Sequence, residues 1–197
     1  MARSARRARR AVAATTTKPA FEAARRARFY IVSLPVLVLV HAFPVGARMW
    51  APQIDAFPGS RVLTPSLPGF DGTARAQPTM EACAQRLLAV LDAAGVERAV
   101  VGGLSLGGYV AFAIARLAPA RLAGLILADT RSAADSDAAK AGRERMLRLI
   151  DEGGAAAVAE DMIPKLLGPS TLMSRMDVVE RVRDLIGSQT PVALADA

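Results

Sequence analysis

The sequence is poor in the residues and segments from which several classes of protein are built. Cysteine occurs once in the 197 residues, as Cys83, which excludes a disulfide framework and a cysteine-based metal site. Long apolar runs are also lacking, because residues 29–40 are too few to span a bilayer and Pro35 interrupts them. No apolar segment follows the early arginines, as a secretory signal would require. These absences fit a reducing compartment, and we expect a cytoplasmic protein.

Excess positive charge is confined to the N-terminal segment. Residues 1–28 hold nine Lys and Arg against one acidic residue, a charge of +8, while the whole chain carries +7. The rest of the chain is therefore almost neutral, and no nucleic-acid-binding surface is expected on the folded body. We interpret residues 1–28 as a basic, disordered extension. The alternatives are a transit peptide, or an arm that contacts anionic lipid or nucleic acid.

Apolar strands and helices alternate along residues 29–131. The continuous apolar runs 36–40 and 122–128 are typical of strands buried on both faces. Further strands are predicted over 61–64 and 98–102, and helices over 46–56, 79–94 and 106–117. This alternation predicts an α/β fold in which right-handed crossovers build a parallel sheet. With no strand predicted after it, the run 122–128 is expected to form an open apolar edge that promotes aggregation.

The pattern changes after Asp129, where only helices are predicted. They cover 134–152, 154–167 and 177–186, with breaks at Gly153 and at Gly168-Pro169. We assign residues 29–131 to the core and residues 132–197 to a helical cap. Thr190 and Pro191 have the form of a helix start, so the chain is expected to stop in mid-element.

A G-x-S-x-G motif, formed by Gly103, Ser105 and Gly107, lies between an apolar strand and an apolar helix. With Gly and Ser each near ~7% of residues, it should occur by chance about 0.06 times in a chain of this length. The backbone must reverse so sharply at Ser105 that it is strained, and the flanking glycines provide the room. The serine hydroxyl is then displayed as a nucleophile. The N–H of Leu106, at the start of the helix, points at a developing oxyanion.

Four segments in this order resemble the α/β-hydrolase superfamily over about residues 35–190. They are the oxyanion loop His41-Ala42-Phe43-Pro44, the LPGxG-like loop Leu67–Gly72, the nucleophile turn Gly103–Gly108 and the cap-entering strand Leu125–Thr130. The bacterial enol-lactonases, esterases and haloperoxidase-like hydrolases are the most similar group. Ala42 stands where the family usually has glycine, which narrows the approach to the oxyanion site. The resemblance implies an incomplete α/β-hydrolase core with a helical cap, in which Phe43 and Leu106 donate N–H groups to the oxyanion. It implies no metal and no organic cofactor.

Histidine is as scarce as cysteine, and His41 is the only one. In the family the base histidine and the usual acid follow later strands, for which this chain has no residues. We therefore expect a truncated form with residual catalysis of about 10³–10⁴ over water at most. His41 is interpreted as a structural member of the oxyanion loop rather than as the base. Asp129 is a candidate acid because it ends a parallel strand, and a strand-end cap is the alternative.

The predicted helix 134–152 carries two sets of side chains. Arg143, Arg145 and Arg148 alternate with acidic residues, which indicates a solvated face rather than an anion site, and Met146, Leu147 and Ile150 are expected to face the sheet or a substrate cavity. The leading hypothesis is a serine hydrolase of a small ester, lactone or related carbonyl compound. The alternative is a degenerate hydrolase that binds a ligand or partner without catalysis.

Overall fold

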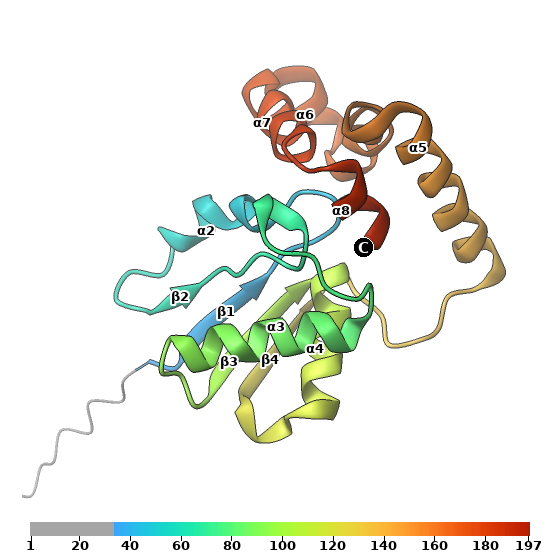
Figure 1. Cartoon of the computed structure of the whole chain (residues 1–197). Helices are drawn as coiled ribbons and strands as arrows, with labels where there is room; N and C mark the ends of the chain where they lie inside the picture. Colours follow the sequence, from blue (N-terminus) through green and yellow to red (C-terminus); the bar gives the residue numbers. More distant parts are fainter. Residues whose placement is uncertain (1–33) are drawn as a thin grey trace, which may run out of the picture. The chain divides into compact units, whose positions relative to one another are not determined.

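The computed structural model describes residues 34–197, which Figure 1 shows as coloured ribbon. The extension predicted over 1–28 and the start of the apolar run 29–40 lie outside the described residues. Four parallel strands pair in the order β2-β1-β3-β4. They are β1 (Val36–Val40), β2 (Val62–Leu63), β3 (Ala99–Leu104) and β4 (Leu122–Ala128). The four predicted strands and the parallel sheet are therefore confirmed.

The strand order places a topological switch between β1 and β3. From β1 the chain moves to β2 on one side, then crosses to β3 on the other side. Val40 at the end of β1 pairs in register with Gly103 near the end of β3. The loops that leave these two strands therefore diverge at one edge of the sheet, which is where open α/β sheets form ligand sites.

Two helices cover one face of the sheet, α3 (Met80–Ala93) and α4 (Leu106–Leu117) (Figure 1). Thr79 caps α3 by accepting a 3.1 Å hydrogen bond from the Ala82 N–H, as its position in the sequence predicts. The fully buried side chains between helices and sheet include Val38, Leu87, Leu91, Val101, Val110 and Ile114. This apolar layer fixes α4, and hence the turn that precedes it, against β1, β3 and β4.

Short helical segments connect the strands. They are η1 (Ala47–Trp50), α2 (Ala51–Ile54), η2 (Phe70–Gly72) and η3 (Pro119–Arg121). The single helix predicted over 46–56 is thus two short pieces. Pro52 lies in the first turn of α2, a position that needs no backbone donor.

Four helices follow β4: α5 (Asp137–Leu166), α6 (Pro169–Ser174), α7 (Met176–Gly187) and α8 (Pro191–Asp196). The predicted break at Gly153 lies one residue later, at Gly154, whose φ of 61° kinks α5. The segment after Gly168 is not only a break, because Pro169 begins α6. Thr190 caps α8 as predicted. None of the helices within residues 34–197 is both long and apolar enough to cross a bilayer.

A buried polar contact joins the end of α7 to the loop around η2. The Gln189 amide, 3% exposed, accepts the Asp71 N–H at 2.9 Å and donates to Asp71 Oδ1 at 3.0 Å. Asp71 also accepts hydrogen bonds from the Ser66 hydroxyl and from the Ala47 N–H. Partial burial raises the pKa of Asp71, but these donors outweigh it and hold the pKa below its usual value.

The strand β4 forms one edge of the sheet. Leu125, Ile126 and Leu127 are 40–48% exposed there, an unusual amount for the side chains of an apolar parallel strand. The open apolar edge expected from the sequence is therefore present within the described residues.

Candidate active site

Ser105 lies in a strained turn between β3 and α4. Its φ of 50° and ψ of −109° are unfavourable for a residue with a side chain. A Cβ on Gly103 would collide with the backbone of Gly107, and a Cβ on Gly107 would collide with the carbonyl oxygen of Val40. The strain and the need for both glycines, expected from the motif, are thus confirmed.

Neighbouring elements hold this turn in place. The Ser105 N–H donates to the Ala128 carbonyl at 2.9 Å, and the Thr130 hydroxyl donates to the Ser105 carbonyl at 2.9 Å. Because Gly108 has no side chain, the Thr130 side chain can occupy the space beside it. Because strained conformations persist only where the surroundings enforce them, these contacts indicate a turn built to present Ser105.

A cavity of about 550 Å³ is lined by Ser105, by the loops that leave β1, β3 and β4, and by helices α5 and α8. From the core it is lined by the predicted site residues Phe43, Ser105, Leu106 and Asp129. From α5 the apolar lining includes Met146, Leu147 and Ile150, as expected. The structure therefore brings four of the five predicted site residues to one cavity.

The two N–H groups predicted to stabilise an oxyanion are available to donate to a ligand. Within residues 34–197, neither the Phe43 N–H nor the Leu106 N–H donates a hydrogen bond to a protein acceptor. Leu106 begins α4, so the positive end of the helix dipole adds to its donor. Phe43 and Leu106 line the same cavity as Ser105, so both amides meet the first requirement of the predicted oxyanion site, an unpaired donor.

His41 is the predicted site residue that does not line the cavity. Its ring is fully buried, Nδ1–H donates to the Ala42 carbonyl at 3.1 Å, and Nε2 accepts the Leu67 N–H at 3.0 Å. Burial lowers the pKa of His41, an effect only partly opposed by the hydrogen bond to Ala42 and by the charge of Asp71. A neutral imidazole with both nitrogens in hydrogen bonds fits the interpretation of His41 as a structural residue of its loop. It has no free acceptor for the proton of Ser105.

Asp129 directly follows β4, has a φ of 41° and lines the same cavity as Ser105. Within the described part of the chain, no hydrogen bond links the Ser105 hydroxyl to another side chain. The structure thus places Ser105 and Asp129 in one cavity, with no imidazole between them.

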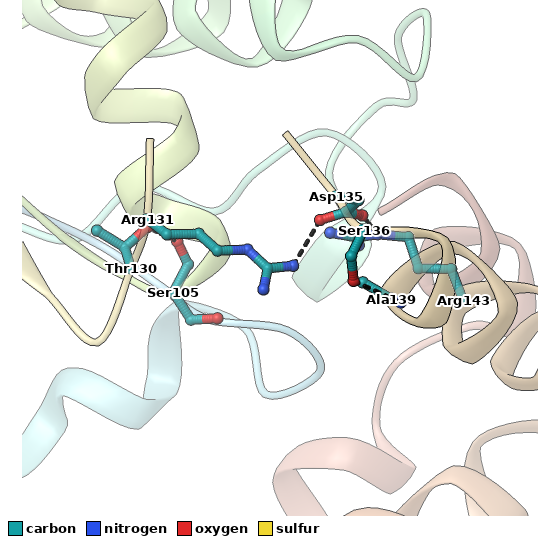
Figure 2. Close-up of polar contacts among 7 residues, drawn as sticks. All are labelled: Ser105, Thr130, Arg131, Asp135, Ser136, Ala139 and Arg143. Atoms are coloured by element: carbon teal, nitrogen blue, oxygen red, sulfur yellow. Dashed lines mark hydrogen bonds and ion pairs between the residues drawn. The ribbon is translucent and has the colours of Figure 1, made fainter. Parts of the chain in front are cut away.

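Sequence reasoning missed an ion cluster on the α5 side of this cavity, which Figure 2 shows. Arg131 donates to Asp135 Oδ1 at 2.6 Å, and Arg143 donates to Asp135 Oδ2. These hydrogen bonds, that from Arg143 first, lower the pKa of Asp135 to about 2. Arg131 and Arg143 both line the cavity. Arg143 is exposed, as the predicted solvated face requires, and its contact with Asp135 is the part that the sequence did not indicate.

The fold is shared with known enzymes. A family model described as the alpha/beta hydrolase fold matches residues 35–187. The chain belongs to this family. It is 43% identical over 97 residues to a pimeloyl-[acyl-carrier protein] methyl ester esterase from Aromatoleum aromaticum, an alignment that covers 49% of this chain and 37% of that protein.

Solved structures of hydrolases have the same arrangement. A malate-bound thermophilic esterase from Thermogutta terrifontis is 41% identical with a TM-score of 0.77, over 83% of this chain and 61% of that one. An enol-lactonase from Burkholderia xenovorans is 25% identical with a TM-score of 0.73, over 82% of this chain and 62% of that one. The chain thus spans less than two thirds of each of these three relatives, which are two esterases and an enol-lactonase.

Proposed function

We propose that Ser105 is the nucleophile of a hydrolase that acts on a small ester, a lactone or a related carbonyl compound. The observation that carries this proposal is the enforced strained turn that displays Ser105 in a cavity beside two unpaired N–H groups. Strain of this kind costs roughly 1–3 kcal/mol and is found mainly where function requires it. Relatives that include an esterase and an enol-lactonase support the substrate class.

The geometry supports acyl transfer. The Ser105 Oγ attacks the acyl carbon, the carbonyl oxygen takes up negative charge, and the Phe43 and Leu106 N–H groups stabilise it. Collapse of this intermediate expels the alcohol and leaves an acyl group on Ser105, which water then removes. Asp129 is the candidate for orienting a base.

The proton of Ser105 must go to a base, and His41 is occupied by the backbone. Since His41 is the only histidine of this sequence, we propose that the chain as given reacts slowly unless a base is supplied. Free imidazole can take that role, because it is small enough to enter an open cavity and its conjugate acid has a pKa near that of histidine.

A fluorophosphonate probe tests the proposal. The Ser105 Oγ forms a bond to phosphorus, fluoride leaves, and imidazole takes the proton. We expect intact-mass analysis to show one probe per chain, formed faster with added imidazole, and no labelling of Ser105→Ala. Ser132→Ala is the matched control, since Ser132 is exposed and outside the cavity, and should be labelled like the starting protein.

Two results would overturn the proposal. One is labelling that persists in Ser105→Ala, which would place the reactive nucleophile elsewhere. The other is an unlabelled starting protein at high imidazole concentration when thermal melting shows that it is folded.

A further inference from the structure

The charged side chains that line the Ser105 cavity are mostly cationic. Arg131, Arg143 and Lys165 line it, against one acidic side chain, Asp129. Lys165 is paired with Asp161 on the same helix, so its charge is already compensated. The two arginines share a single carboxylate, that of Asp135, and so keep a net charge of +1.

The two guanidinium groups have N–H donors that their contacts with Asp135 do not use. Each donates one hydrogen bond to Asp135, whereas a guanidinium has five N–H donors in a planar fork. Figure 2 shows Arg131 reaching from the end of β4 to Asp135, which Arg143 approaches from α5. The shared carboxylate thereby fixes two arginines from different elements close together. Both side chains are about half exposed, at 50% and 53%, so a ligand can reach them.

We infer that Arg131 and Arg143 form a carboxylate-binding subsite, and that the substrate is an ester with a free carboxylate at its far end. This inference rests on the proposed function, because it assigns the substrate of the Ser105 cavity. The planar fork of each guanidinium matches the two oxygens of a carboxylate. Met146, Leu147 and Ile150 line the same cavity and supply an apolar wall for the hydrocarbon between ester and carboxylate.

Binding can be measured apart from chemistry in the Ser105→Ala chain, which cannot turn the ligand over. Isothermal titration calorimetry compares monomethyl adipate, which carries one carboxylate, with dimethyl adipate, which carries none. We expect the monoester to bind at least about tenfold more tightly, since a charge-assisted hydrogen bond is worth that much. Sodium chloride should weaken the monoester and leave the diester unchanged.

Variants locate the subsite. Arg131→Gln and Arg143→Gln should each lower monoester affinity about tenfold, and Arg143→Lys should fall between, because it keeps the charge and loses the fork. Arg148→Gln is the matched control, an exposed arginine of the same helix outside the cavity, and should bind as before. Unchanged melting temperatures show that the variants are folded.

The inference is overturned if the monoester does not bind, or if monoester and diester bind equally. It is also overturned if inorganic phosphate binds more tightly than the monoester, or if Arg148→Gln loses as much affinity for the monoester as Arg143→Gln. Failure of the proposed function has a different signature. A chain that binds the monoester through Arg131 and Arg143, yet is never labelled at Ser105, keeps the subsite and loses the nucleophile.

Discussion

Replacing Gly103 with alanine tests the crowding on which the whole site depends. The new Cβ would lie inside contact distance of the Gly107 carbonyl group and the Gly108 nitrogen. These are backbone atoms in the first turn of α4, which packs against β1, β3 and β4 and cannot turn aside as a flexible side chain would. Gly168 provides a matched control. Its φ is −69°, and a Cβ placed there meets nothing within 4 Å.

The two substitutions add the same methyl group and should differ widely in effect. Gly103→Ala forces backbone displacement in a packed turn, so we expect the free energy of unfolding to fall by at least about 3 kcal/mol. Gly168→Ala should change it by less than about 1 kcal/mol, because the loss of a glycine N-cap opposes the gain from a less flexible unfolded chain and no clash is introduced. Urea denaturation followed by circular dichroism measures both. A Gly103→Ala protein within about 0.5 kcal/mol of the parent would refute the crowding argument.

Three further outcomes are expected. Gln189→Ala should lose about 1–3 kcal/mol in urea denaturation because it leaves buried donors and acceptors of Asp71 unpaired, whereas Gln53→Ala on the exposed α2 should lose almost nothing. The lowered pKa of Asp71 stabilises the fold above its unfolded value of 3.8, so the stability gap between the parent and Asp71→Asn should be full at neutral pH and close as the pH falls through the folded pKa; a gap independent of pH would contradict this. Ile126→Lys should reduce self-association in sedimentation velocity by charging the exposed edge of β4, and Leu117→Lys, equally exposed but on α4, should not.

The sequence was sufficient for the features that depend on local pattern. Continuous apolar runs predicted β1 and β4 with their bounds, and Thr79 and Thr190 marked two helix starts, because caps and buried strands are set by neighbouring residues. The same reasoning placed the kink of α5 at Gly153, since adjacent glycines are equivalent in a pattern and only packing selects Gly154.

Contacts between distant segments were beyond that reasoning. Asp71 and Gln189 are 118 positions apart, and nothing in either local sequence indicates the other. The sequence placed Arg143 on a solvated helix face but could not show its contact with Asp135. Helical periodicity indicates which residues share a face of a helix, but not which other segments that face contacts. One signal was present: Arg131 follows Asp129 and Thr130 at the carboxyl end of a parallel strand, the edge where ligand sites form. The same rule predicts that Arg131, like Asp129, lies at a ligand site.

His41 is of a residue type that often acts in catalysis, but both of its ring nitrogens make structural contacts with the backbone. Its ring joins two loops that the sequence separates by 26 positions, since Nε2 accepts the N–H of Leu67 while the backbone of His41 continues into the oxyanion loop. Protonation would remove that acceptor, and burial already disfavours the charged form. To act as a base, His41 would have to leave both of its partners and break the contact that holds Phe43 and its loop beside Ser105. The buried position that makes this histidine unsuitable as a proton acceptor therefore allows it to hold the loop that carries Phe43, one of the two proposed oxyanion donors.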